Sequence, residues 1–223
     1  MRKVIGIVGE GPTDYMVLRE VVDHITGEEN EYRRLQPEPD MAGRFGNGCK
    51  GVWRWCETTS DVLDRVFYGV TPQLDLLIIQ MDADVSRKER EVHCPVILPC
   101  GHHVQKPSGY EEHLEQLINI WLGNCPNNEN ILITIPCDST DTWIVAAYQD
   151  YGNVEEIKNP WESVIARKKE YHGIRIPGNK KRASVYSQLL PRLCQQWERV
   201  VEQCYSARRF DDKVKRIFGA AGL

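Results

Sequence analysis

The chain has 223 residues, of which 41% are hydrophobic and 27% are charged. These values exclude a disordered or fibrous chain, and the length suits a single α/β domain over residues 1–223. The formal net charge of -4 gives no general case for a nucleic-acid partner, which would need a local basic patch.

No apolar run approaches the roughly 20 residues of a membrane helix, and nothing near the N-terminus resembles a signal peptide. We therefore predict a cytoplasmic protein without a membrane partner. The eight cysteines are irregularly spaced, which favours reduced thiols over a disulfide framework.

In chain order, the first half begins with a β-branched run, Val4 to Val8, which predicts a buried strand. A tight turn follows, and a helix begins at Thr13 or Asp14 and ends near Gly27. Residues 28–57 are polar and glycine-rich, and predict a long loop with one weak strand. We expect a helix from Ser60 and then the strongest strand of the chain over residues 74–81.

The second half continues the alternation. The predicted elements are a short strand at Val96–Leu98, a helix from the capping box of Ser108 and Glu111 to Leu122, a strand over Ile131–Ile135 and a helix from about Thr142. A basic, loop-like segment follows at residues 167–182. A C-terminal helical extension then spans residues 183–223, with a long helix and a short final one. Alternating strands and helices predict a mostly parallel, Rossmann-like sheet with helices on both faces.

Acidic residues follow three of these strands. They are Glu10, the pair Asp82 and Asp84, and the pair Asp138 and Asp141. In parallel sheets, ligands bind beyond the carboxyl ends of the strands, so we expect these acids to converge. Crowded carboxylates repel one another unless a cation lies between them, and hard oxygen ligands select Mg²⁺ or Mn²⁺. The pattern therefore indicates a divalent-metal site.

Each acid also has a simpler interpretation. Glu10 and Asp14 could merely favour the dipole of the first helix, and Asp138 and Asp141 could cap theirs. A D-x-D pair can be a solvated turn. The pair Asp82 and Asp84, however, directly follows the most apolar strand, where charge is costly unless it is exposed or liganded.

Two further clusters stay open. The side chains His93, Cys94, Cys100, His102 and His103 could bind zinc, but they lack a C-x-x-C knuckle, and an ordinary loop would look the same. The basic segment 167–182 could be a solvated face or could contact phosphates, with Tyr171 and His172 as stacking groups. Trp143 and Trp197 lie in apolar helical stripes and are expected in the core.

The loops after two strands resemble the signature motifs of the Toprim superfamily. The matching stretches are Gly9-Glu10-Gly11-Pro12-Thr13-Asp14 and Asp82-Ala83-Asp84-Val85-Ser86. The nearest likeness is to small Toprim-like proteins, related to overcoming-lysogenization-defect nucleases, that are encoded beside ABC-type ATPases in anti-phage defence systems. The likeness extends to residues 136–147 and to the tail at 180–218.

The resemblance implies roles for matching positions. Asp82 and Asp84 would be the principal metal ligands, Glu10 a ligand or general acid/base, and Asp14 and Asp141 ligands of a second metal. Asp141 stands where relatives tend to have a longer Glu. Either Lys180 or Lys181 would stabilise charge on the scissile phosphate, and the sequence does not decide between them.

The leading hypothesis is a metal-dependent nuclease acting on DNA or RNA, an effector of anti-phage defence. The alternative is a non-catalytic or conditionally active Toprim module regulated by a partner ABC-type or AAA ATPase. The chain itself has no Walker A motif. It is also too short for the extra domains of topoisomerases, and it lacks the zinc ribbon of primases.

Overall fold

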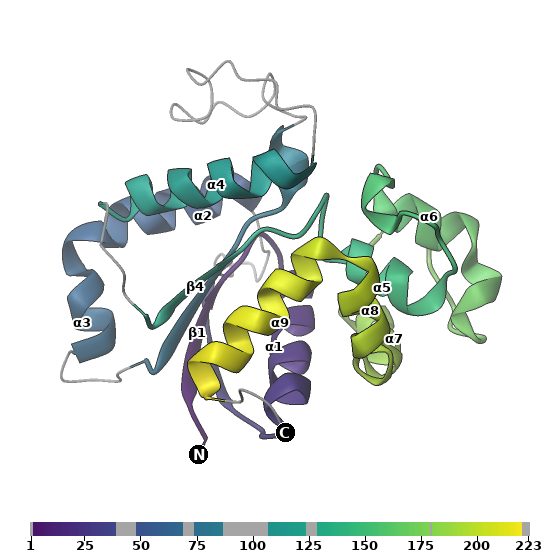
Figure 1. Ribbon diagram of the computed structural model, residues 1–223, viewed down its shortest axis with the longest axis horizontal. Helices are drawn as coiled ribbons and strands as arrows, with labels where there is room; N and C mark the ends of the chain where they lie inside the picture. Colours follow the sequence, from purple (N-terminus) through teal and green to yellow (C-terminus); the bar gives the residue numbers. More distant parts are fainter. Residues whose placement is uncertain are drawn as a thin grey trace.

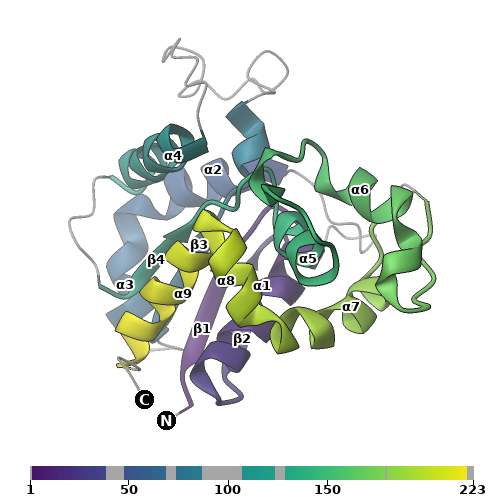
Figure 2. The same ribbon diagram turned by 45° about the vertical axis from the view of Figure 1, so that its right-hand side comes forward.

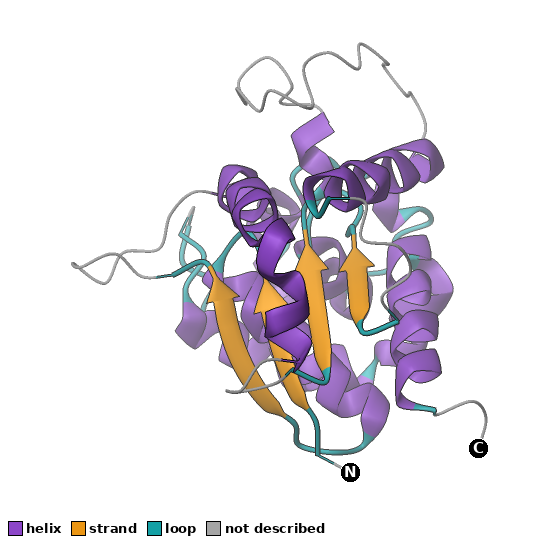
Figure 3. Ribbon diagram, turned by 90° about the vertical axis from the view of Figure 1, so that its left-hand side faces the viewer, coloured by secondary structure: helices purple, strands orange, loops and turns teal. Residues whose placement is uncertain are grey.

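The computed structural model describes residues 2–38, 48–68, 74–86, 107–123, 129–178 and 180–219. Within these ranges the chain forms a sheet of four parallel strands in the order β2-β1-β3-β4. The strands are β1 (Val4–Val8), β2 (Glu31–Gln36), β3 (Leu76–Gln80) and β4 (Ile131–Thr134). All four arrowheads point the same way in Figure 3, so the loops that follow the strands share one edge of the sheet.

The two central strands are buried on both faces. All five residues of β3 are buried, and Ile5 and Ile7 of β1 are fully inaccessible. This is why their sequences read as continuous apolar runs. Gly6 of β1 packs closely against its neighbours, because a Cβ at this position would force the side-chain methyl groups of Leu74 and Leu35 to shift.

Helices cover both faces of the sheet, as predicted, and the fold is Rossmann-like. One face carries α2 (Gly48–Thr59), α3 (Leu63–Tyr68) and α4 (Pro107–Trp121) (Figure 1). The other carries α1 (Pro12–Thr26), α5 (Asp141–Tyr148), α7 (Ala183–Gln195), α8 (Trp197–Gln203) and α9 (Tyr205–Phe218). The short helix α6 (Pro160–Ala166) packs on α5 beyond the carboxyl edge (Figure 2).

The C-terminal helices build the core of their face. Trp143 of α5 is fully buried, lies edge-on to Trp197 at 5.5 Å between ring centroids, and also contacts Phe210 of α9. Its indole N–H donates to Ser206 Oγ at 3.1 Å. The prediction that Trp143 and Trp197 are core residues is confirmed.

Three local predictions were wrong. Residues 48–59 are helical and not loop, because Val52 and Cys56 form a buried stripe on α2 that outweighs its glycines. The expected long C-terminal helix breaks at Gln196, which leaves the helical conformation between α7 and α8. The final helix, α9, is long, with 14 residues. Among its described residues the basic segment 167–182 is loop-like, as predicted, apart from a 3₁₀ turn at Lys168–Tyr171.

Some predictions fall outside the described residues. These are the strand at Val96–Leu98 and the whole Cys/His cluster, His93, Cys94, Cys100, His102 and His103. The side chains of the capping box, Ser108 and Glu111, also lie outside the description, although α4 does begin nearby, at Pro107. None of the described cysteines, Cys49, Cys56, Cys137, Cys194 and Cys204, forms a disulfide within the described residues. None of the described helices combines the length and apolar character needed to span a bilayer.

Candidate functional site

The loops after β1 and β3 are joined by hydrogen bonds between Glu10, Gln80 and Asp82. Glu10 Oε1 accepts from the backbone N–H of Asp82 at 2.9 Å. The Gln80 side chain bridges the two loops, because its Oε1 accepts from the Glu10 N–H at 3.1 Å and its Nε2 donates to Asp82 Oδ1 at 2.6 Å. Two acids separated by 72 residues therefore lie side by side at the carboxyl edge, as the sequence predicted.

Asp82 lies among other carboxyl groups at this edge. Its side chain is buried, and this burial raises its pKa well above the usual value, with further upward contributions from Asp14, Glu10 and Asp84. Lys181 opposes the shift but does not cancel it. A carboxyl group in this position needs either a proton or a nearby cation.

Asp14 belongs to the first turn of α1 and faces the loop after β4. It is only 6% exposed, and Thr140 Oγ1 donates to its Oδ1 at 2.6 Å. Burial raises its pKa to about 6, with a smaller upward contribution from Asp141. Asp14 therefore adds buried negative charge behind Asp82.

Asp141 opens α5 and is held by three side chains. Lys181 Nζ lies 2.6 Å from its Oδ2, Ser139 Oγ donates to the same oxygen at 3.4 Å, and the Tyr186 hydroxyl donates to Oδ1. Burial alone would lower the pKa of Lys181, but Asp141, Asp82 and Asp14 raise it above its usual value. Lys181 is therefore a fixed cation.

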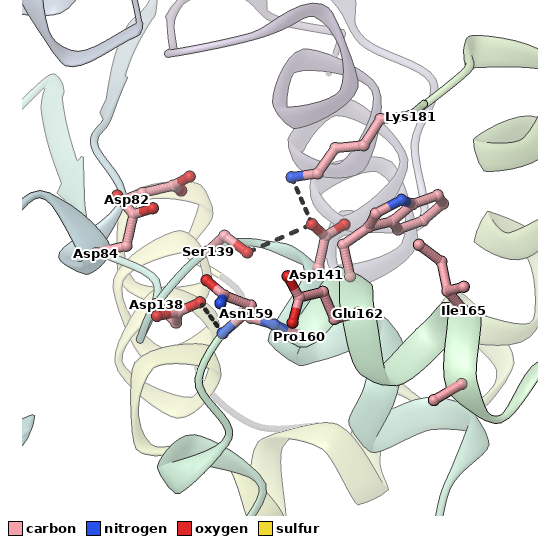
Figure 4. A pocket seen from close by; sticks show the side chains of 12 residues that line it. Asp82, Asp84, Asp138, Ser139, Asp141, Asn159, Pro160, Glu162, Ile165 and Lys181 are labelled. Atoms are coloured by element: carbon pink, nitrogen blue, oxygen red, sulfur yellow. Dashed lines mark hydrogen bonds and ion pairs between the residues drawn. The ribbon is translucent and has the colours of Figure 1, made fainter. Parts of the chain in front are cut away.

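These groups line one side of a pocket of about 530 Å³ (Figure 4). The side formed by the strand loops contains Asp82, Asp84, Asp138, Ser139 and Asp141, with Lys181 close by. The remaining lining comes from α6 and its preceding residue: Asn159, Pro160, Trp161, Glu162, Ile165 and Ala166. Glu10 and Asp14 do not line the pocket: Glu10 accepts a hydrogen bond from the backbone of the lining residue Asp82, and Asp14 accepts one from Thr140.

The arrangement of the carboxylates limits the kind of divalent-cation site that they can form. Within the described ranges, no three His, Cys, Asp or Glu side chains stand close enough together to enclose an ion. Mg²⁺ usually binds only one or two protein carboxylates and completes its shell with water and substrate phosphate. The pair Asp82 and Asp84 fits such an open site, since both line the pocket and the charge of Asp82 is uncompensated.

Several residues of the site were missed by sequence reasoning. Gln80 was counted as part of an apolar strand, although a lone amide before a D-x-D pair is a detectable signal. Thr140 and Tyr186 were not assigned to Asp14 and Asp141 because such side-chain pairings depend on how distant segments meet. The α6 side of the pocket was also missed, since its short helix carries no motif. Lys180, the other candidate lysine, is exposed on the surface.

Fold and site together define an α/β protein of the Rossmann-like class with an acidic pocket at the carboxyl edge of its sheet, in which Lys181 is paired with the buried Asp141. Comparison of the chain with protein-family models, with curated proteins and with solved structures gave no match. The function must therefore be argued from the geometry of this pocket.

Proposed function

We propose that this chain is a Toprim-like, divalent-metal-dependent nuclease that hydrolyses phosphodiester bonds of DNA or RNA. The observation that carries the proposal is the buried Asp82 carboxyl group, crowded by Glu10, Asp14 and Asp84 and facing a pocket that also holds Lys181. The crowded carboxylates would bind a cation, and Lys181 lies beside them. A phosphate could then be held between this cation and the ammonium group of Lys181.

Each residue has a role in this scheme. Asp82 and Asp84 would hold Mg²⁺ or Mn²⁺, which when bound would neutralise phosphate charge and activate water. Glu10 fixes the backbone of Asp82 and would act as a metal ligand or as the general acid/base. Lys181 donates to a phosphate oxygen. Asp141 is better placed to hold Lys181 than to bind metal, because its oxygens already accept from Lys181 and Tyr186.

Basic residues that follow α6 in the chain support a nucleic-acid substrate. Lys168, Lys169 and Arg175 are exposed, and none of them forms an ion pair with another described residue. Arg167 at the end of α6 lies over the ring of Tyr151, 4.5 Å from its centroid. Exposed basic side chains of this kind can bind backbone phosphates irrespective of the base sequence.

The proposal is tested by incubating the purified protein with labelled DNA and RNA in Mg²⁺, in Mn²⁺ and in EDTA. We expect metal-dependent cleavage that Asp82→Ala abolishes. The matched control is Asp61→Ala, which removes an exposed carboxylate from the 3₁₀ turn at Ser60–Val62 and should leave cleavage unchanged. Cleavage that survives Asp82→Ala would reject this site as its source.

A second candidate is a conditionally active module that responds to a partner ABC-type ATPase, as an effector of anti-phage defence. It is favoured by the intramolecular contacts of the acids, because Glu10 and Asp141 accept protein hydrogen bonds and no described trio is arranged around an ion. Inactivity of the isolated chain, followed by cleavage when the ATPase and ATP are added, would select this candidate.

A further inference from the structure

The inference concerns the substrate and rests on the proposed nuclease function. The pocket has two chemically different sides (Figure 4), with Asp82 and Asp84 on one and Glu162 and Ile165 of α6 on the other. Among the described lining residues, Lys181 is the one basic side chain. With a divalent cation held by Asp82 and Asp84 as proposed, a phosphate would be attracted to the end of the pocket where Lys181 lies, whereas the carboxylate of Glu162 disfavours phosphate along α6.

The exposed surface of α6 is suited to an aromatic, uncharged group. Ile165 is partly exposed and Ala166 is exposed, so both present apolar atoms to the pocket. Asn159 and Glu162 add an amide and a carboxylate beside them. An apolar surface with a few polar groups at its margin is the usual lining of a site for a flat heterocycle.

This surface is held in place before any ligand binds. Trp161 is 7% exposed and stacks on Tyr186, with ring centroids 5.5 Å apart and an interplanar angle of 15°. The Asn159 N–H donates to Asp138 Oδ2 at 3.1 Å, which links the start of α6 to the acidic side of the pocket. The spacing between the two sides is therefore fixed by the fold and does not require closure around a ligand.

The size of the pocket limits what can enter it. Its volume of about 530 Å³ lies within the usual range of sites that take one small ligand, such as a single nucleotide. One nucleotide fits, whereas a paired base cannot reach α6 without leaving its partner.

We propose that the pocket binds one unpaired nucleotide, with its phosphate beside Asp82, Asp84 and Lys181 and its base against Ile165 and Ala166. The preferred substrate is then single-stranded nucleic acid or an unpaired end. The strand continues past the end of α6 toward Lys168 and Lys169, whose exposed ammonium groups meet the next phosphates.

The test uses the full chain and four fluorescent probes of equal length: single-stranded DNA, single-stranded RNA, blunt duplex DNA and blunt duplex RNA. Binding is measured by anisotropy in Ca²⁺, and cleavage is measured separately in Mn²⁺. We expect at least one single strand to bind about tenfold more tightly than its duplex, which is within the range for stacking of one base. The two single-stranded arms distinguish DNA from RNA.

Ala166→Trp fills the base side of the pocket from an exposed position and should lower single-strand affinity about tenfold without changing Tm. The control is Glu202→Trp, which adds the same side chain at an exposed position on α8. Equal affinity for single strands and duplexes, or unchanged binding by Ala166→Trp, overturns the inference. Absence of cleavage in all four probes counts against the proposed nuclease, while the binding results still decide the inference.

Discussion

Lys181 Nζ lies 2.6 Å from Oδ2 of Asp141, whose side chain is only 1% exposed, while the side chains of Lys181 and of the adjacent Lys180 are both exposed. A buried carboxylate thus fixes one of two consecutive ammonium groups in the pocket. The same carboxylate accepts a hydrogen bond from the Tyr186 hydroxyl, and the ring of Tyr186 stacks on Trp161. The position of the cation therefore depends on a chain of contacts that runs from α6 through α7 to α5.

The first prediction separates the two lysines. We expect Lys181→Met to lower kcat of nuclease cleavage by about 100-fold, because it removes a preorganised charge from the transition state. Lys180→Met is the matched control and should retain nearly full kcat. Single-turnover kinetics with saturating Mn²⁺ make the comparison, and the reverse ranking of the two variants would assign the phosphate contact to Lys180.

The second prediction concerns Tyr186 as a positioning residue. Tyr186→Phe keeps the stacking on Trp161 but removes the donor to Asp141. We expect a loss of about 1–2 kcal/mol in the free energy of unfolding, together with a clear fall in kcat. Urea denaturation and cleavage assays measure the two effects.

Tyr148→Phe provides the control for Tyr186→Phe. The buried Tyr148 hydroxyl donates to the Leu189 carbonyl at 3.1 Å, remote from the acids. The Tyr148→Phe variant should lose a similar amount of stability and keep its nuclease activity. If both variants lose kcat equally, the role of Tyr186 is only structural.

The position of the acids could be predicted from the sequence because it follows from topology. Apolar runs at Val4–Val8 and Leu76–Gln80 indicate parallel central strands, and the residues after such strands must meet at one edge. That reasoning placed Glu10 beside Asp82, and the hydrogen bond between them agrees with it.

The partners of the acids could not be predicted in the same way. The contact between Tyr186 and Asp141 depends on how α7 docks on α5, which is a matter of tertiary packing and not of local pattern. Helix α2 was missed for a similar reason, since Gly48 and Gly51 weaken local helix propensity while burial of Val52 and Cys56 against the sheet restores it.

The third prediction concerns the bridging amide of Gln80. Gln80→Met preserves approximate volume but removes the bonds to the Glu10 N–H and to Asp82 Oδ1. We expect Mn²⁺ affinity to fall about tenfold, as it does when the support of a ligand is removed. Isothermal titration calorimetry measures this change, and Gln149→Met, whose amide bonds Tyr171 and Ser163, is the buried control. Unchanged Mn²⁺ affinity in Gln80→Met would show that the bridge does not position the ligands.

The last prediction is a dependence of stability on pH in the metal-free protein. The pKa of Asp14 rises from 3.8 to about 6 on folding, chiefly because of burial, and that of Asp82 rises as well. Between pH 3.8 and about pH 6, Asp14 is mostly ionised in the unfolded chain and mostly protonated in the folded chain. The contribution of Asp14 to the free energy of unfolding therefore falls as pH rises through this window and stays low above it.

At roughly 1.4 kcal/mol per pKa unit, the Asp14 contribution amounts to about 3 kcal/mol at most. Urea denaturation in EDTA at pH 4 and pH 7 should show this loss in the wild type relative to Asp14→Asn, a difference in which the titration of carboxylates distant from Asp14 cancels. Mg²⁺ binds the ionised carboxylates, so it should stabilise the wild type at pH 7 and much less at pH 4. Equal stabilisation by Mg²⁺ at both pH values, or a wild type as stable as Asp14→Asn at pH 7 in EDTA, would show that no uncompensated charge is buried at this edge of the sheet.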